Sequence, residues 1–122
     1  MLLVAFLLEV TFGAAFLVAP AVTMAPVGVT LVGMAADAFR LFGTALLGFA
    51  LLLWCAHRTT NHEVKGVAIR TLAAYYSLSA LVLLWLQLAG RFNVLGWGMV
   101  ATHVGFALWF LSALKAKPSS RP

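Results

Sequence analysis

Residues Val67 to Ala89 read VAIRTLAAYYSLSALVLLWLQLA, a stretch of 23 residues with a single charged side chain, Arg70. A helix of about 20 predominantly apolar residues crosses the roughly 30 Å hydrocarbon core of a bilayer. Because lipid offers no hydrogen-bond partners to the backbone, an isolated segment of this kind satisfies its backbone groups only as a helix. The stretch therefore predicts a membrane-spanning helix.

Three more apolar stretches of 18, 19 and 21 residues flank this one, over residues 2–19, 38–56 and 94–114. Their lengths also meet the requirement for crossing a bilayer. We therefore expect an all-α fold, a transmembrane four-helix bundle that forms a single membrane domain over residues 1–116. The segment 117–122 is expected to be a disordered tail. The first stretch carries Glu9 and has no basic residue before its apolar run, so we expect a retained helix and not a cleaved signal peptide.

The composition gives the same result as the stretches. Apolar residues make up 64% of the chain, against about 45–50% in ordinary globular proteins, and charged residues 9%, against about 25%. Too few polar side chains remain to cover a surface in water, which excludes a soluble enzyme, a nucleic-acid-binding domain and a disordered chain. The net charge is +5, but the basic residues are scattered at segment ends without interleaved aromatic residues. No nucleic-acid partner is therefore expected.

Lys and Arg are distributed unequally between the two ends of the expected helices. With four spans, both termini and the link 57–66 share one side, which holds Arg58, Lys65, Arg70, Lys115, Lys117 and Arg121. The other side holds Arg40 and Arg91. Because Lys and Arg collect in cytoplasmic segments, this distribution predicts that both termini are cytoplasmic.

The connection 20–37 contains Pro20 and Pro26 and is apolar apart from two threonines and Asp37. A solvated external loop would carry more polar residues. We expect this segment to lie on the external surface of the membrane or to dip into it, as a short helix over the mouth of the bundle. The alternative is that it extends the flanking spans.

Two ionisable residues lie near the middle of expected spans, Glu9 in the first and His103 in the fourth. Ionisable groups inside a membrane are costly and indicate function by default. If these two spans are neighbours, Glu9 and His103 would meet as a carboxylate–imidazole pair that loads and releases a proton near neutral pH. The alternative is that each side chain bonds a neighbouring helix or a backbone carbonyl and only sets the packing.

Other polar residues add candidates. Tyr75 and Tyr76, with two nearby serines, form a polar patch in the third span and are further candidates for ligand binding or proton coupling. Asp37 and Arg40 stand three residues apart at the outer start of the second span, a natural helix pair. We interpret this outer-mouth pair as a polar helix start with a snorkelling arginine, and an anion or headgroup contact is the alternative.

The chain also carries features expected to contact its surroundings. Arg70 lies one turn inside the third span and is expected to snorkel to the cytoplasmic surface, where anionic lipid would bind it. Small residues four positions apart, at Thr44 and Gly48 and at Ala101 and Gly105, permit close approach between helices. We expect membrane lipid, together with a second copy or a larger membrane complex, as partners.

No Ser-His-Asp set, phosphate-binding glycine loop or multi-cysteine metal spacing occurs in the sequence. His57, His62 and Glu63 gather around the cytoplasmic link without a further supporting ligand. We expect no catalytic residues, no metal site and no cofactor, and hence a protein that is not an enzyme.

Two motifs carry a family resemblance. Arg40-Leu-Phe-Gly43-Thr-Ala-Leu-Leu-Gly48 runs on to Trp54, and Asn93-Val-Leu-Gly96-Trp97 opens the fourth span. With the break at Pro20, the chain resembles small bacterial four-helix integral membrane proteins, DoxX-like in layout and mostly of unknown function. The resemblance implies a multi-pass protein of the bacterial inner (plasma) membrane and supplies no catalytic residues.

A second resemblance is confined to Leu8-Glu9-Val10-Thr11, which is similar to the segment around the membrane-embedded glutamate of small multidrug resistance transporters. The apolar connection 20–37 and the basic link 57–66 depart from that family.

Two functional hypotheses follow. The first is a non-enzymatic membrane protein, either an accessory subunit that packs with partners or a bundle that binds a lipophilic ligand. The alternative is a small proton-coupled transporter that uses Glu9 with His103.

Overall fold

A computed structural model of the chain describes residues 1–115, and all regular structure within this range is helical. The elements are α1 (Leu2–Val18), α2 (Pro20–Met24), the 3₁₀ turn η1 (Ala25–Val27), α3 (Met34–Arg58), α4 (His62–Leu88) and α5 (Gly96–Lys115). The tail expected over 117–122 lies outside the described residues.

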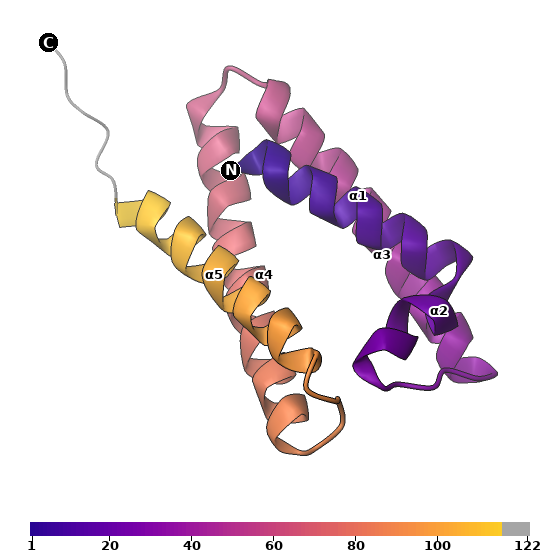
Figure 1. The fold of residues 1–122 in the computed structure, drawn as a ribbon. Coiled ribbons are helices and arrows are strands. Elements are labelled where there is room, and N and C mark those ends of the chain that lie inside the picture. Colours follow the sequence, from indigo (N-terminus) through magenta and orange to yellow (C-terminus); the bar gives the residue numbers. More distant parts are fainter. Residues whose placement is uncertain (116–122) are drawn as a thin grey trace, which may run out of the picture.

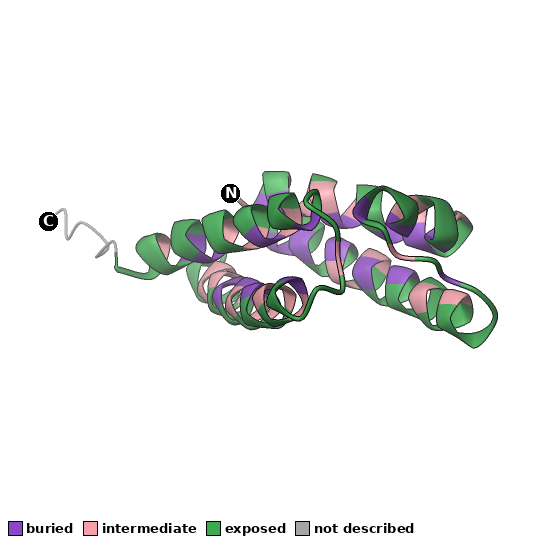
Figure 2. Cartoon of the chain, turned by 60° about the horizontal axis from the view of Figure 1, so that its bottom comes forward, coloured by how far each residue is buried: buried purple, intermediate pink, exposed green. Residues whose placement is uncertain are grey.

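Three of these helices, α3, α4 and α5, are long and apolar enough to cross a membrane, whereas α1 is apolar but shorter, with 17 residues. Less than a quarter of the most apolar segment of each long helix is buried inside the protein. Figure 2 shows the buried residues where helices meet and exposed residues over the outward faces. Since these exposed faces are rich in large hydrophobic side chains, including all four tryptophans, they are suited to lipid and not to water. The helix lengths and the exposed apolar side chains are those of a multi-pass membrane protein.

The boundaries of the helices do not coincide with the boundaries of the apolar stretches. α3 begins at Met34 and α4 begins at His62, several residues before the expected spans 38–56 and 67–89. The side chain of Asn61 explains the early start of α4, because its Oδ1 accepts hydrogen bonds from the backbone N–H groups of Glu63 (2.9 Å) and Val64 (3.2 Å). Most of the polar link 57–66 is therefore helical.

The breaks between helices follow local chemistry. Pro20 ends α1 and begins α2, because proline disfavours a helical conformation at the residue before it and has no N–H to lose at the first helical position. Gly90, at φ 68°, ends α4 in a Schellman motif: its N–H donates to the carbonyl of Gln87, and the N–H of Arg91 donates to that of Leu86.

The helices α1, α3, α4 and α5 pack as two antiparallel pairs, α1 with α3 and α4 with α5, which lie at an angle to each other (Figure 1). α3 and α4 contact each other much less than each contacts its own partner. One core cluster nevertheless receives residues from α1, α3, α4 and α5: Leu2, Ala5, Leu53, Ala56, Leu72, Ala73, Tyr76, Ala107 and Phe110. This cluster joins the two pairs.

Two glycines set the approach of α1 to α3. A Cβ atom on Gly43 would lie 2.6 Å from the backbone nitrogen of Leu17 and 2.7 Å from the carbonyl oxygen of Gly13. Backbone therefore packs directly on backbone here, which only small residues permit. The expected small-residue positions Gly48 and Gly105 instead face open space, since a Cβ on either would meet nothing within 4 Å.

The connection between α1 and α3 folds back onto these helices. Met24, Val27 and Leu31 form a second buried cluster with Phe16 of α1 and Leu46 of α3. The connection contains the short helix α2, but it ends at residue 33 and not at 37, because α3 starts earlier than expected.

Asn93, in the turn between α4 and α5, attaches this connection to the other helix pair. Its backbone N–H donates to the carbonyl of Val27 (2.9 Å), and its side-chain Nδ2 donates to that of Pro26 (2.8 Å). The two helix pairs are thus linked at this end by hydrogen bonds, and at the other end by the core cluster.

Candidate functional site

Glu9 lies on the buried face of α1, in register with Leu2, Ala5, Gly13 and Phe16. Only 5% of its surface is exposed. The hydroxyl of Tyr76 on α4 donates a hydrogen bond of 2.9 Å to Oε1 of the Glu9 carboxyl group. Tyr76 is itself buried, so this contact between the two helix pairs is shielded from the surroundings.

His103 does not bond to Glu9. Its Nδ1 lies 2.9 Å from the carbonyl oxygen of Met99, one turn back on α5, and its ring lies 5.7 Å from the ring of Tyr76. Because a carbonyl only accepts, this contact requires a proton on Nδ1 of the imidazole. The expected direct pair between Glu9 and His103 is therefore not formed within the described residues, since Tyr76 supplies the partner of the carboxyl group. Both residues meet at Tyr76 instead.

Aromatic rings from α5 hold Tyr76 in place. Its ring stacks on Phe106 at 4.9 Å and on Phe110 at 5.8 Å between centroids. Aromatic pairs at such distances add to the stability given by burial. The hydroxyl is thus aimed at Glu9 by packing and not by a flexible side chain.

Tyr75, the next residue, points to a different surface. Its ring lies 5.3 Å from Phe49 of α3 and 5.1 Å from Tyr76. Tyr75 is half-buried and lines a hollow between α3 and α4. The expected tyrosine patch is therefore divided: Tyr76 serves the buried carboxyl group, and Tyr75 serves the surface between the helix pairs.

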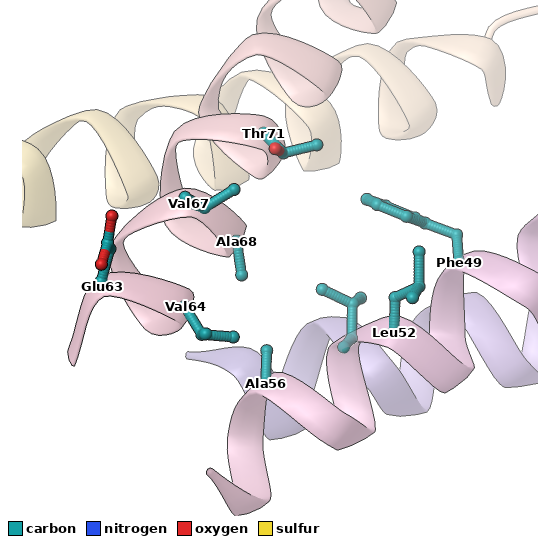
Figure 3. Close-up of a pocket in the computed structure, with 9 residues that line it drawn as sticks. Phe49, Leu52, Ala56, Glu63, Val64, Val67, Ala68 and Thr71 are labelled. Carbon is teal, nitrogen blue, oxygen red and sulfur yellow. The ribbon is translucent and has the colours of Figure 1, made fainter. Parts of the chain in front are cut away.

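The surface between α3 and α4 is hollowed in two places. The larger hollow has a volume of about 430 Å³ and is lined by Phe49, Leu52, Leu53, Ala56, Glu63, Val64, Val67, Ala68 and Thr71 (Figure 3). A smaller hollow of about 220 Å³ adjoins it, lined by Phe42, Ala45, Leu46, Phe49, Thr71 and Tyr75. We call the two together the α3–α4 groove. Its walls are almost entirely hydrocarbon.

The groove was not predicted from the sequence. Its lining residues are ordinary apolar residues of two spans, and only the angle between the helix pairs makes them a concave surface. A sequence signal for this angle would have been the early start of α4 at Asn61, which shortens the link between α3 and α4 to residues 59–61.

Asp37 and Arg40 form the expected helix pair near the start of α3. Nη1 of Arg40 lies 2.7 Å from Oδ1 of Asp37, and both side chains are exposed. They lie on α3 before the groove begins at Phe42, and they belong neither to the groove nor to the Glu9 cluster. The charge of each side chain in this ion pair is partly neutralised by the other.

Among residues 1–115, no group of three or more His, Cys, Asp or Glu side chains gathers in a way that would hold a metal ion. Glu9, Tyr76 and His103 supply a carboxyl group, a phenol and an imidazole. Groups of these kinds can exchange and hold a proton.

No protein-family model, no curated protein and no solved structure matches this chain.

Proposed function

We propose that this chain is a non-enzymatic membrane protein that crosses the bilayer four times and binds a lipophilic molecule in the α3–α4 groove. The observation that carries this proposal is the groove itself, an apolar hollow of about 430 Å³ between two helices of membrane-spanning length. Sites for small ligands are typically concave, mainly apolar and of roughly 300–1,000 Å³.

The proposal includes a fourth crossing of the membrane, made by α1. The 17 residues of α1 extend about 25 Å at 1.5 Å per residue, somewhat less than the hydrocarbon thickness. α1 packs closely along α3, which is long enough to cross, and a shorter helix is accommodated by local thinning of the bilayer. With four crossings, the excess of Lys and Arg favours cytoplasmic termini in a bacterial inner membrane, in keeping with the DoxX-like layout.

The position of the groove favours a ligand that arrives from the membrane. The groove runs from Phe42 to Ala56 along α3, within the membrane-spanning part of the helix. Water molecules are poorly stabilised in a hollow with such walls, because water needs polar hydrogen-bond partners. An apolar molecule buries the same walls and gains their contacts.

The test fills the groove. Ala68 lines the larger hollow, and replacing it by phenylalanine places a ring inside (Figure 3). Ala74, on the same helix, is exposed and lines neither hollow, so Ala74→Phe is a matched control. Native mass spectrometry from mild detergent measures the added mass. We expect a retained molecule in the parent protein and in Ala74→Phe, and its loss in Ala68→Phe. Equal retention in all three proteins would refute the groove as the site.

The same spectra report the number of copies in the particle. A packing role within a larger complex is the other form of this proposal, and a bare, defined oligomer without added mass in the parent protein would favour it over ligand binding.

A second candidate function is a small proton-coupled transporter. It is supported by the buried hydrogen bond from Tyr76 to Glu9, with His103 packed against the same tyrosine. An intramembrane acid with a named partner is a typical coupling site. Glu9→Gln keeps an acceptor for Tyr76 but removes the exchangeable proton, so it should abolish pH-driven uptake into proteoliposomes. Uptake with an unchanged pH profile in Glu9→Gln would exclude this function.

A further inference from the structure

The hydrogen bond from Tyr76 to Glu9 begins one residue away from the α3–α4 groove. Tyr75 lines the smaller hollow, and Tyr76 is the next residue of α4. Successive residues of an α-helix point about 100° apart, since 3.6 residues complete one turn. With Tyr76 facing Glu9 on α1, Tyr75 therefore faces α3, where its ring lies 5.3 Å from that of Phe49.

Other groove residues of α4 share the face of Tyr75. Ala68 and Thr71 precede Tyr75 by seven and four residues, and residues at these spacings lie on one side of a helix. The rotation of α4 about its own axis thus decides whether these side chains line the groove.

Apolar packing alone specifies this rotation weakly, because apolar contacts are not directional and α4 carries apolar side chains on its exposed as well as its buried faces. The stacking of Tyr76 on Phe106 and Phe110 fixes α4 against α5, so these two helices turn as a unit. Within residues 1–115, one side chain-to-side chain hydrogen bond joins this unit to the pair of α1 and α3, that from Tyr76 to Glu9. Rotation away from this position would leave a buried carboxyl group without its donor, which is costly.

We propose that Glu9 and Tyr76 are positioning residues for the ligand of the groove: their hydrogen bond fixes the rotation of α4 and α5 against α1 and α3, and the groove binds its ligand in that rotation. This inference rests on the proposed ligand-binding function and adds two residues that line neither hollow. A carboxyl oxygen accepts this bond with or without a proton on Glu9, and so does an amide oxygen. The positioning role therefore differs from proton coupling, which needs the exchangeable proton.

The experiment counts retained lipid. The protein is reconstituted in bilayers of palmitoyl-oleoyl phosphatidylglycerol, a probe of a single mass, extracted in mild detergent and measured by native mass spectrometry. Tyr76→Phe and Glu9→Leu should each reduce the lipid retained per chain about threefold to tenfold, as expected for the loss of one hydrogen bond. Glu9→Gln keeps the acceptor and should retain as much lipid as the parent protein. Ala74→Phe, which is exposed and outside both hollows, is the control.

The double variant separates positioning from stability. Glu9→Leu combined with Tyr76→Phe removes both polar groups, so that no buried carboxyl group lacks a donor. Its melting temperature should approach that of the parent protein, while its lipid retention should stay at the reduced level, because only apolar contacts then set the rotation. Retention that recovers together with the melting temperature would show a contribution to stability alone and would overturn the inference.

The remaining outcomes separate this inference from the function on which it rests. Parent-like retention in Tyr76→Phe and Glu9→Leu, together with loss in Ala68→Phe, would overturn the positioning role and leave the groove as the site. Equal loss in Glu9→Gln and Glu9→Leu would assign the effect to the ionisable group and not to the hydrogen bond, which overturns the inference as well. A parent protein that retains no lipid, or retention that Ala68→Phe does not change, would contradict the proposed function itself.

Discussion

The hydroxyl of Tyr76 on α4 lies 2.9 Å from Oε1 of Glu9 on α1, and within residues 1–115 it makes the one side chain-to-side chain hydrogen bond between the two helix pairs. Everything else at this junction is apolar packing, in the cluster to which α1, α3, α4 and α5 all contribute. A polar contact shielded in this way fixes the position of α4 against α1 more specifically than apolar side chains do.

Tyr76→Phe is expected to destabilise the protein by about 1–3 kcal/mol, because it keeps the stacked ring but leaves the buried carboxyl group without its donor. Thermal unfolding in detergent, followed by circular dichroism, measures the effect. Glu9→Leu combined with Tyr76→Phe removes both polar groups and should unfold at a temperature closer to that of the parent protein. Strictly additive effects of the two single changes would contradict an interaction between these residues.

Gly43→Ala is expected to weaken the pairing of α1 with α3. The added methyl group would meet backbone atoms of Leu17 and Gly13, which cannot move aside, and overpacking of this kind typically costs about 1–3 kcal/mol. Gly48→Ala, five residues along the same helix, faces open space and should be neutral or slightly stabilising, because alanine favours helix. Chemical unfolding of the two variants side by side checks this, and equal stability would argue against the close helix contact.

Asn93→Ala is expected to loosen the connection between α1 and α3. The change removes the hydrogen bond from Nδ2 to the carbonyl of Pro26 and the one that Oδ1 accepts from the backbone N–H of Leu95, while the backbone bond to Val27 remains. A loss of about 0.5–1.5 kcal/mol should appear as faster hydrogen–deuterium exchange in the peptide covering residues 20–33. Arg91→Gln, in the same turn, is exposed and serves as the control. Unchanged exchange in Asn93→Ala would mean that this bond does not hold the connection.

The proposed orientation predicts which loops face outward. In a Cys55→Ser background, Thr30→Cys in the connection before α3 should react with a membrane-impermeant maleimide in intact cells. Thr60→Cys, in the α3–α4 turn, should react only after the membrane has been opened. The reverse pattern would invert the topology, and labelling of both positions in intact cells would contradict four crossings.

The sequence predicted the helices well and their ends less well. The lengths of the apolar stretches are enough to indicate helices, because lipid leaves the backbone no other partner. Both α3 and α4 start earlier than the expected spans, since residues 34–37 already belong to α3, and the polar residues from His62 onward belong to α4, which Asn61 caps. The apolar stretches indicate which residues contact lipid, whereas the ends of the helices are determined by backbone hydrogen bonds.

The pairing of the helices could not be predicted, and the site depends on it. In a soluble helix one apolar face marks the partner, but here every face is apolar, so nothing in the sequence distinguished Tyr76 from His103 as the partner of Glu9. The same reason explains the glycines: the four-residue spacing indicated Gly48 and Gly105, and the close contact involves Gly13 and Gly43.

The central claim is that the α3–α4 groove holds an apolar chain, and site-directed photocrosslinking tests it most directly. The protein is reconstituted with a phospholipid that carries a diazirine in one acyl chain, extracted in mild detergent to remove loosely bound lipid, irradiated, and mapped by peptide mass spectrometry. The account predicts adducts concentrated on residues 42–56 of α3 and 63–75 of α4. Adducts of equal yield on outward-facing residues such as Leu81 and Leu108 would contradict it.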